Sequence, residues 1–212
     1  MKHIVFDIET IAQDEARLLA LAPEFTAPAN LKDPAKIDAA IAKKRADYLA
    51  DAALNWKTAE VVLIGAGDDT QIQSFTAGSE KELVGDFLGL LGEALADGVA
   101  VGGHNVKGFD LPMLINRARV HGLKIPMTVL SFWKGRPTWH ESIFDTLELL
   151  SFGKAFDGNG VDDVARVFGL PPKLGHGGDF PRLWRTDRAG AVAYNRRDVE
   201  IEIEIARMCG CI

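Results

Sequence analysis

Apolar and polar residues follow two different periods along this chain, and the two periods predict strands and helices. Four short apolar runs have the length and composition of buried strands: residues 4–8, 61–66, 98–103 and 143–145. Residues 70–75 alternate between polar and apolar side chains and are expected to form a hairpin with the run before them. Helices are expected over residues 79–96, 110–120 and 160–169. This order predicts an α/β fold with a mixed central β-sheet flanked by α-helices.

The C-terminal region carries two competing signals. Residues 200–205 alternate strictly between glutamate and isoleucine, which is the period of a strand. The neighbouring Glu, Ala, Arg and Met residues favour a helix. We predict a helix, because a helix would bring Tyr194 and Asp198 onto one face. The glycine-rich residues 172–185 are expected to form a loop before it.

Residues 12–57 separate the first two strands. Asp33-Pro34 is a helix-start signal, and the helix is expected to run to about Leu54. We interpret this stretch as a helical insertion within a single domain that spans residues 1–212, a length that suits one domain with a full core.

Composition narrows the class of protein. The net charge of −6 argues against a broad basic surface, although a carboxylate-rich metal site would add negative charge that its cations neutralise. No run of about 18 apolar residues is present, so we expect no membrane span. The N-terminus lacks the pattern of a signal peptide, and the two cysteines, Cys209 and Cys211, are few and close together. We therefore expect a cytoplasmic protein.

The first strand carries two carboxylates on one face. Alternate side chains of a strand point to opposite sides, so Asp7 and Glu9 share a face while Ile4, Phe6 and Ile8 point into the core. Two neighbouring acids repel each other, and burial makes their charges more costly. A bound cation would remove that cost, so this strand predicts a metal site.

Three further residues suit the same site. Asp110 follows an aromatic residue at the start of a predicted helix, and Asp198 follows Tyr194 by four residues. Carboxylates are hard oxygen ligands that suit Mg²⁺ or Mn²⁺, and no His/Cys spacing indicates zinc. Two such cations are a common device for phosphodiester hydrolysis. A tyrosine beside a metal ligand can orient the attacking water or help to deprotonate it.

These motifs resemble those of a known nuclease family. FDIET at residues 6–10, NVKGFD at residues 105–110, and Tyr194 with Asp198 are similar, in this order, to the three motifs of the DEDDy branch of the DEDD 3′–5′ exonucleases. That family has the ribonuclease-H-like fold. Residues 109–114 most resemble the exonuclease domain of family B DNA polymerases and the stand-alone predicted exonucleases related to it. Each motif alone is weak, but three motifs in order are specific.

The resemblance implies a role for each residue of the site. Asp7 would bridge two divalent cations, Mg²⁺ or Mn²⁺. Glu9 and Asp198 would hold the cation that activates water, and Asp110 would serve the second cation directly or through water. Tyr194 would position the nucleophile.

The resemblance also implies a substrate. Thr10, Ile11, Asn105 and Phe109 are expected to lie beside the terminal nucleotide. We therefore predict a metal-dependent 3′–5′ exonuclease that acts on single-stranded DNA and releases nucleoside 5′-monophosphates. A DNA polymerase or a repair protein would be a compatible partner. The sequence does not predict the oligomeric state.

Several alternatives remain open from the sequence. Ribonuclease D relatives share the DEDDy pattern, so RNA is an alternative substrate. A nucleic-acid-binding module could keep the fold without catalysis, although the full set of acids speaks against it. Asp145 is expected to be a helix cap and not a ligand. Residues 134–139 mix basic and aromatic side chains, as single-strand-binding surfaces and solvated loops both do.

Overall fold

The computed structural model describes residues 3–131, 142–152 and 159–212, without the side chain of Ser131. The chain divides into two compact units. The larger comprises Met1–Glu9 and Val61–Ile212, and the smaller comprises Thr10–Glu60. Each unit is described separately below.

A five-stranded mixed sheet forms the centre of the larger unit, in the order β3-β2-β1-β4-β5. β1 pairs in parallel with β4, β4 pairs in parallel with β5, and β2 pairs antiparallel with β3. The strands are β1 (His3–Ala12), β2 (Ala59–Gly67), β3 (Ile72–Phe75), β4 (Ala100–Gly103) and β5 (Ile143–Asp145). The predicted strands and the hairpin of β2 with β3 are confirmed.

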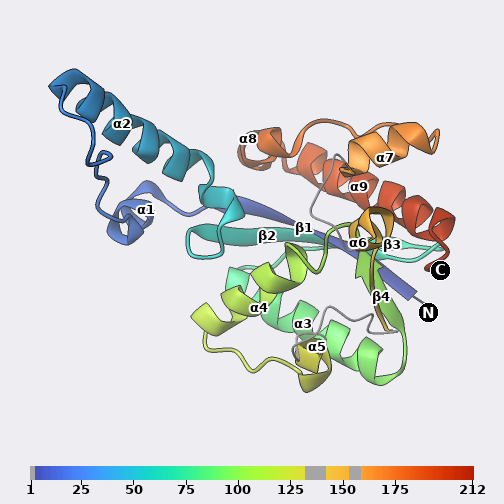
Figure 1. Ribbon diagram of the computed structural model, residues 1–212. Coiled ribbons are helices and arrows are strands. Elements are labelled where there is room, and N and C mark those ends of the chain that lie inside the picture. The colour runs from blue at the N-terminus through green and yellow to red at the C-terminus, as the bar shows by residue number, and fades with distance from the viewer. Residues whose placement is uncertain (1–2, 132–141, 153–158) are drawn as a thin grey trace. The chain divides into compact units, whose positions relative to one another are not determined.

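Helices cover both faces of this sheet (Figure 1). On one face lie α3 (Glu80–Ala96), α4 (Asp110–Val120) and α5 (Met127–Ser131). On the other lie α7 (Val161–Val167), α8 (Phe180–Thr186) and α9 (Arg188–Met208). The short α6 (Thr146–Ser151) follows β5 directly. The helix predicted over residues 200–205 is confirmed, because α9 runs through the whole alternating segment.

The side chains of β1 point alternately to the two faces of the sheet, and they pack against helices on both. Phe6 is fully buried and its ring centroid lies 5.4 Å from that of Phe87 on α3. Val5 points the other way and packs in a cluster with Val199 and Ile203 of α9. Since side chains alternate along a strand, Asp7 lies on the same face as Val5, toward α9. The apolar core therefore determines which way the acidic residues of β1 point.

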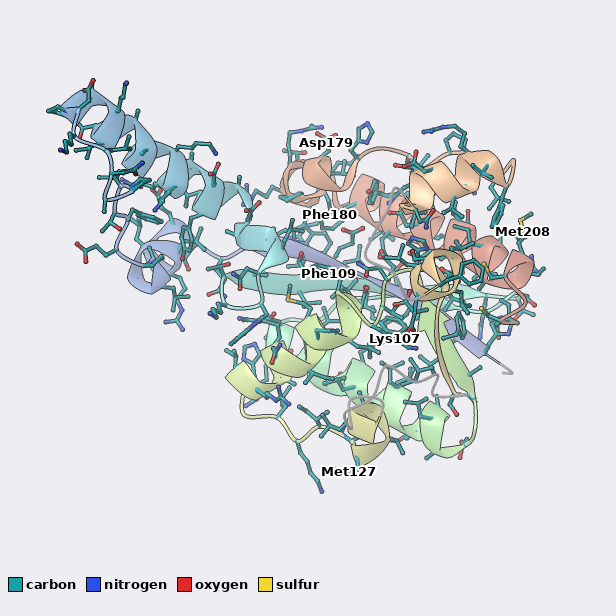
Figure 2. The ribbon with its side chains drawn as sticks, in the orientation of Figure 1. Lys107, Phe109, Met127, Asp179, Phe180 and Met208 are labelled. Carbon is teal, nitrogen blue, oxygen red and sulfur yellow. The ribbon has the colours of Figure 1, made fainter. Side chains whose placement is uncertain are left out.

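The prediction of a loop over residues 172–185 is wrong for the second half of that segment. Residues 177–179 form a turn of 3₁₀ helix, and α8 follows at once. Phe180 lies at the start of α8 (Figure 2). Trp184 follows it by one helical turn, and both side chains are buried, so packing holds α8 in place. Pro181 lies in its first turn, where the missing N–H costs nothing.

A buried ion pair connects α3, α4 and β2. The Glu80 carboxylate accepts hydrogen bonds from the Val61 N–H at 2.8 Å, from Arg117 Nε at 2.8 Å and from His121 Nε2 at 2.6 Å. Burial alone would raise the pKa of Glu80, but the bond from Arg117 and the other two hold that pKa below its usual value. The charged carboxylate therefore helps to fix α3 and α4 against the sheet.

The smaller unit contains α1 (Glu15–Leu21), α2 (Pro34–Ala50) and a 3₁₀ turn (Ala52–Leu54). Asp33 caps α2 by accepting the Ala35 N–H at 2.9 Å, which confirms the predicted helix start. The Tyr48 hydroxyl donates to the Leu18 carbonyl at 2.9 Å and so links the two helices. None of the helices in the described residues combines the length and the hydrophobicity that a membrane span requires.

Candidate active site

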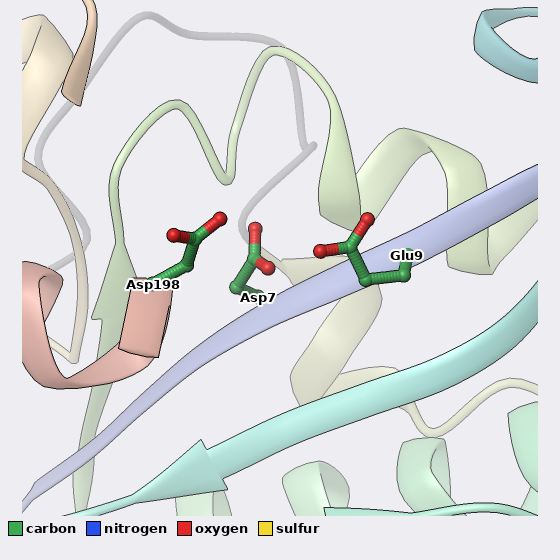
Figure 3. A group of neighbouring side chains, drawn as sticks. All are labelled: Asp7, Glu9 and Asp198. Carbon is green, nitrogen blue, oxygen red and sulfur yellow. The ribbon is translucent and has the colours of Figure 1, made fainter. Parts of the chain in front are cut away.

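Three carboxylates from distant parts of the chain converge beside β1. Asp7, Glu9 and Asp198 each offer an oxygen, and these oxygens lie within 4.8 Å of one another (Figure 3). Asp7 and Glu9 come from β1, and Asp198 comes from α9. Three oxygens at this spacing could hold a divalent cation between them.

The electrostatics of this cluster favour a bound cation. Burial raises the pKa of Asp7 to about 7, and the Asp198 carboxylate adds to the effect. Burial and then Asp7 raise the pKa of Glu9 well above its usual value. One oxygen of Asp198, Oδ1, is buried and has no hydrogen-bond partner among the described residues. A buried carboxylate oxygen without a donor is costly, and a metal ion would satisfy it. The residues therefore fit Mg²⁺ or Mn²⁺.

A lysine also reaches this cluster. Lys173, in the loop between α7 and α8, places Nζ 2.7 Å from Asp198 Oδ2 and 5.5 Å from the centroid of the Tyr194 ring. Burial alone would lower the pKa of Lys173, but the Asp198 carboxylate outweighs it and raises that pKa. Lys173 is therefore a cation that partly neutralises the acids.

Tyr194 lies one helical turn before Asp198 and is 3% exposed. Burial and the Asp198 carboxylate both raise the pKa of its hydroxyl. The hydroxyl therefore stays protonated at neutral pH. A protonated phenol can orient a water by hydrogen bonding, but it is not a base.

Asp110 is placed against β1 but is not a member of the group of three. Its Oδ1 accepts the Ile8 backbone N–H at 3.0 Å. This N–H is open to Asp110 because the pairing with β4 ends at Val5. Burial and then the nearby Asp7 raise the pKa of Asp110 well above its usual value. Asp110 therefore adjoins the acidic cluster from the start of α4.

A protein-family model matches more than half of this chain. The model described as "Predicted 3'-5' exonuclease related to the exonuclease domain of PolB" matches residues 47–201. The chain belongs to this family. The matched segment includes Asp110, Tyr194 and Asp198 and begins after β1.

A solved structure similar to this PolB-related chain is the family B DNA polymerase from the hyperthermophilic archaeon Pyrobaculum calidifontis. The identity is 17% and the TM-score is 0.57. The match covers 97% of this chain and 24% of the polymerase chain, so this chain spans about a quarter of that relative. At this identity the likeness shows the fold, which is the ribonuclease-H-like α/β fold that the motifs implied. No curated protein matches the chain.

Three polar residues lie at or beside the site of this PolB-related chain, although sequence reasoning did not select them. They are Lys173, Asn195 and Glu202. Asn195 is fully buried and its Nδ2 donates to Asp7 Oδ2 at 2.8 Å. Glu202 is 3% exposed and accepts the His104 N–H at 3.1 Å. Glu202 lies one helical turn after Asp198, and that spacing is the signal that could have found it.

The predicted substrate-binding residues fall into two groups. Thr10 and Ile11 continue β1 after Glu9 and belong to the smaller unit, where the Thr10 hydroxyl donates to the Ala53 carbonyl at 2.6 Å. Asn105 and Phe109 lie in the loop that leads from β4 to α4. Phe109 is half-buried at the start of α4 (Figure 2).

Asp145 holds the loop that carries Asn105. Its carboxylate accepts the backbone N–H groups of Asn105 and Lys107, both at 2.9 Å, and also caps α6. The expectation that Asp145 is a cap is confirmed. Asn105 has a φ of 65°, in the left-handed region that asparagine tolerates. Residues 134–139, the mixed basic and aromatic stretch, lie outside the described residues.

A pocket of about 540 Å³ opens beside Lys173. Its wall combines charged side chains with apolar ones: Asp162, Arg166, Leu170, Pro172, Lys173 and Leu174. This volume lies in the range of small-ligand sites, about 300–1,000 Å³. The wall therefore presents charges of both signs beside apolar surface.

Proposed function

We propose that this protein is a metal-dependent exonuclease that removes nucleoside 5′-monophosphates from the 3′ end of single-stranded DNA. The observation that supports this most directly is the convergence of Asp7, Glu9 and Asp198 within 4.8 Å. Membership in the PolB-related family supports a nuclease with 3′–5′ polarity. The single-stranded DNA substrate is proposed from the resemblance of the three sequence motifs to those of the DEDDy exonucleases.

In the proposed site, Asp7, Glu9 and Asp198 would hold Mg²⁺ or Mn²⁺, and Asp110 would serve a second cation directly or through water. Such cations, when bound, lower the pKa of water and stabilise the leaving oxygen of a phosphodiester. The buried, unpartnered Oδ1 of Asp198 is the observation in the described residues that best fits a metal.

The protein's own residues would then orient the reactants. Tyr194, held protonated, would hydrogen-bond the attacking water and fix its direction. Lys173 would place a positive charge beside the negatively charged phosphate. Its loop also forms part of the 540 Å³ pocket, which could receive the nucleotide next to the scissile bond.

The test is a cleavage assay with matched labels. A 5′-labelled DNA oligonucleotide with Mn²⁺ should shorten one nucleotide at a time, whereas a 3′-labelled one should release its label at once as a mononucleotide. Asp7→Asn should abolish cleavage, because it weakens the ligand set without changing the shape of the side chain. Asp86→Asn changes an exposed residue of α3 in the same way; it is the matched control and should cleave like the wild type.

The same assay separates the alternatives. Faster shortening of a matched RNA oligonucleotide would assign the protein to exoribonucleases. Binding of the strand in Mn²⁺ without cleavage would indicate a binding module. Endonucleolytic cuts, or cleavage that Asp7→Asn leaves unchanged, would refute the proposed function.

A further inference from the structure

Asn195 contacts the acidic cluster through its side-chain amide. It lies on α9 between Tyr194 and Arg196 and has no exposed surface. Its Nδ2 donates to Asp7 Oδ2 at 2.8 Å and also lies 3.4 Å from the Asp7 backbone carbonyl. One amide therefore contacts both the side chain and the main chain of the same aspartate.

The orientation of this amide follows from its partners. The Asp7 backbone carbonyl is always an acceptor, and the ionised, metal-binding carboxylate is one as well, so the nitrogen points toward Asp7 and the oxygen points away. The oxygen, Oδ1, is buried and has no hydrogen-bond partner in the described part of the chain. In the described part of the chain, the hydrogen bonds of this amide therefore both go to Asp7.

Gly65 on β2 provides the space for Asn195. A Cβ atom at position 65 would lie 2.2 Å from Asn195 Oδ1 and 2.8 Å from Val199 Cγ2. Real Cβ atoms do not approach other atoms so closely. A side chain at position 65 would therefore displace the amide from Asp7, and it would also press on Val199.

We infer that Asn195 is a positioning residue: its amide fixes the Asp7 carboxylate in the orientation that meets Glu9 and Asp198, and Gly65 is required because it makes room for that amide. This role rests on the proposed nuclease function and adds a residue to it. Groups that hydrogen-bond a metal-binding carboxylate orient it, and their loss typically weakens metal binding or activity about 10- to 100-fold.

The test compares three variants of the full chain. Asn195→Ala removes the amide, Asn195→Leu replaces it with an apolar side chain of similar size, and Gly65→Ala displaces it. Each should weaken Mn²⁺ binding about 10- to 100-fold by isothermal titration calorimetry. On a 5′-labelled oligonucleotide, kcat should fall by a similar factor while KM for the strand changes less than about twofold.

Two controls match these changes in type. Gly89→Ala introduces a Cβ on α3 with no atom within 4 Å, and Asn116→Ala removes an amide on α4 that accepts only a bond from Arg119 in the described structure. Both should bind Mn²⁺ and cleave like the wild type. Thermal unfolding in EDTA checks that every variant is folded.

Mn²⁺ affinity and kcat within about twofold of wild type in folded Asn195→Leu and Gly65→Ala would overturn the inference. If Asn195→Ala fails to fold, the other two variants decide. Should all three unfold, Asn195 is a structural residue and the inference is wrong. If the wild type binds Mn²⁺ but cleaves no strand, the proposed function fails, while the Mn²⁺ affinities still decide the role of Asn195.

Discussion

Replacing Asp7 by asparagine should stabilise the metal-free protein at neutral and alkaline pH. Burial and the neighbouring Asp198 raise the pKa of Asp7 from 3.8 to about 7 in the folded protein. The folded state therefore binds a proton that the unfolded state has already lost between these two values. Stability must fall as the pH rises through this window, because deprotonation favours the unfolded chain.

The magnitude follows from the two pKa values. A tenfold change in proton affinity corresponds to about 1.4 kcal/mol. The rise in the pKa of Asp7 from 3.8 to about 7 therefore lowers the free energy of unfolding of the wild type by about 4 kcal/mol above pH 7. Asp7→Asn keeps the shape of the side chain and removes this titration. It also removes a charge that raises the pKa of Glu9.

The assay is urea unfolding in EDTA at pH 4.5 and pH 8, followed by circular dichroism. The stability advantage of Asp7→Asn over the wild type should grow from about 1 kcal/mol at pH 4.5 to about 4 kcal/mol at pH 8. Mn²⁺ should reverse the order, since it binds the wild type more tightly. The control Asp86→Asn changes an exposed residue of α3 and should follow the wild type at both pH values. An advantage that is equal at both pH values would refute the electrostatic reasoning.

Three further changes test other parts of the structure. Tyr194→Phe should lower kcat about 100-fold with unchanged Mn²⁺ affinity, because it removes only the hydroxyl that orients water; a kcat within twofold of wild type contradicts this. Lys173→Met should strengthen Mn²⁺ binding about tenfold in calorimetry, because it removes a cation that already neutralises the acidic cluster. Weaker Mn²⁺ binding by this variant would show that the lysine does not compete with the metal. Arg117→Met should lower the free energy of unfolding in urea by about 3–5 kcal/mol, because it leaves the buried Glu80 carboxylate without its main partner. The surface variant Arg119→Met is the control and should change the free energy of unfolding by less than about 1 kcal/mol, as is usual for exposed contacts.

The sequence was informative where chemistry and periodicity coincide. On β1 the same alternation that buries Phe6 places Asp7 and Glu9 together on the other face. On α9 the four-residue spacing brings Tyr194 beside Asp198, and this spacing decided correctly between a helix and a strand. Both cases need only the geometry of one element, which a local pattern can encode.

Contacts between distant segments could not be predicted in this way. Asn195 and Asp7 are 188 residues apart, and the contact exists only because α9 packs on β1. Lys173 lies in a loop without a regular period, so nothing in the sequence directs its ammonium toward Asp198. The fold brings these groups together through apolar packing that does not involve the polar residues themselves.

The glutamates of α9 show why an alternating pattern misleads. Glu200, Glu202 and Glu204 look equivalent in a strictly alternating run, yet Glu202 is 3% exposed while the side chains of the other two are 39% and 46% exposed. A helix rotates by about 100° per residue, so residues two apart point in nearly opposite directions. Only Glu202 shares the face of Asp198 and faces the sheet.

The apolar contact between β1 and α9 sets the geometry of the acidic site. Val5 packs against Val199 and Ile203, and Asp7 follows Val5 by two residues on the same face of β1. Asp198 immediately precedes Val199 on the helix. A displacement of α9 along β1 would therefore separate the carboxylates and disrupt the valine and isoleucine packing together. Since core packing tolerates such shifts poorly, the hydrophobic core fixes the carboxylates close to one another despite their mutual repulsion.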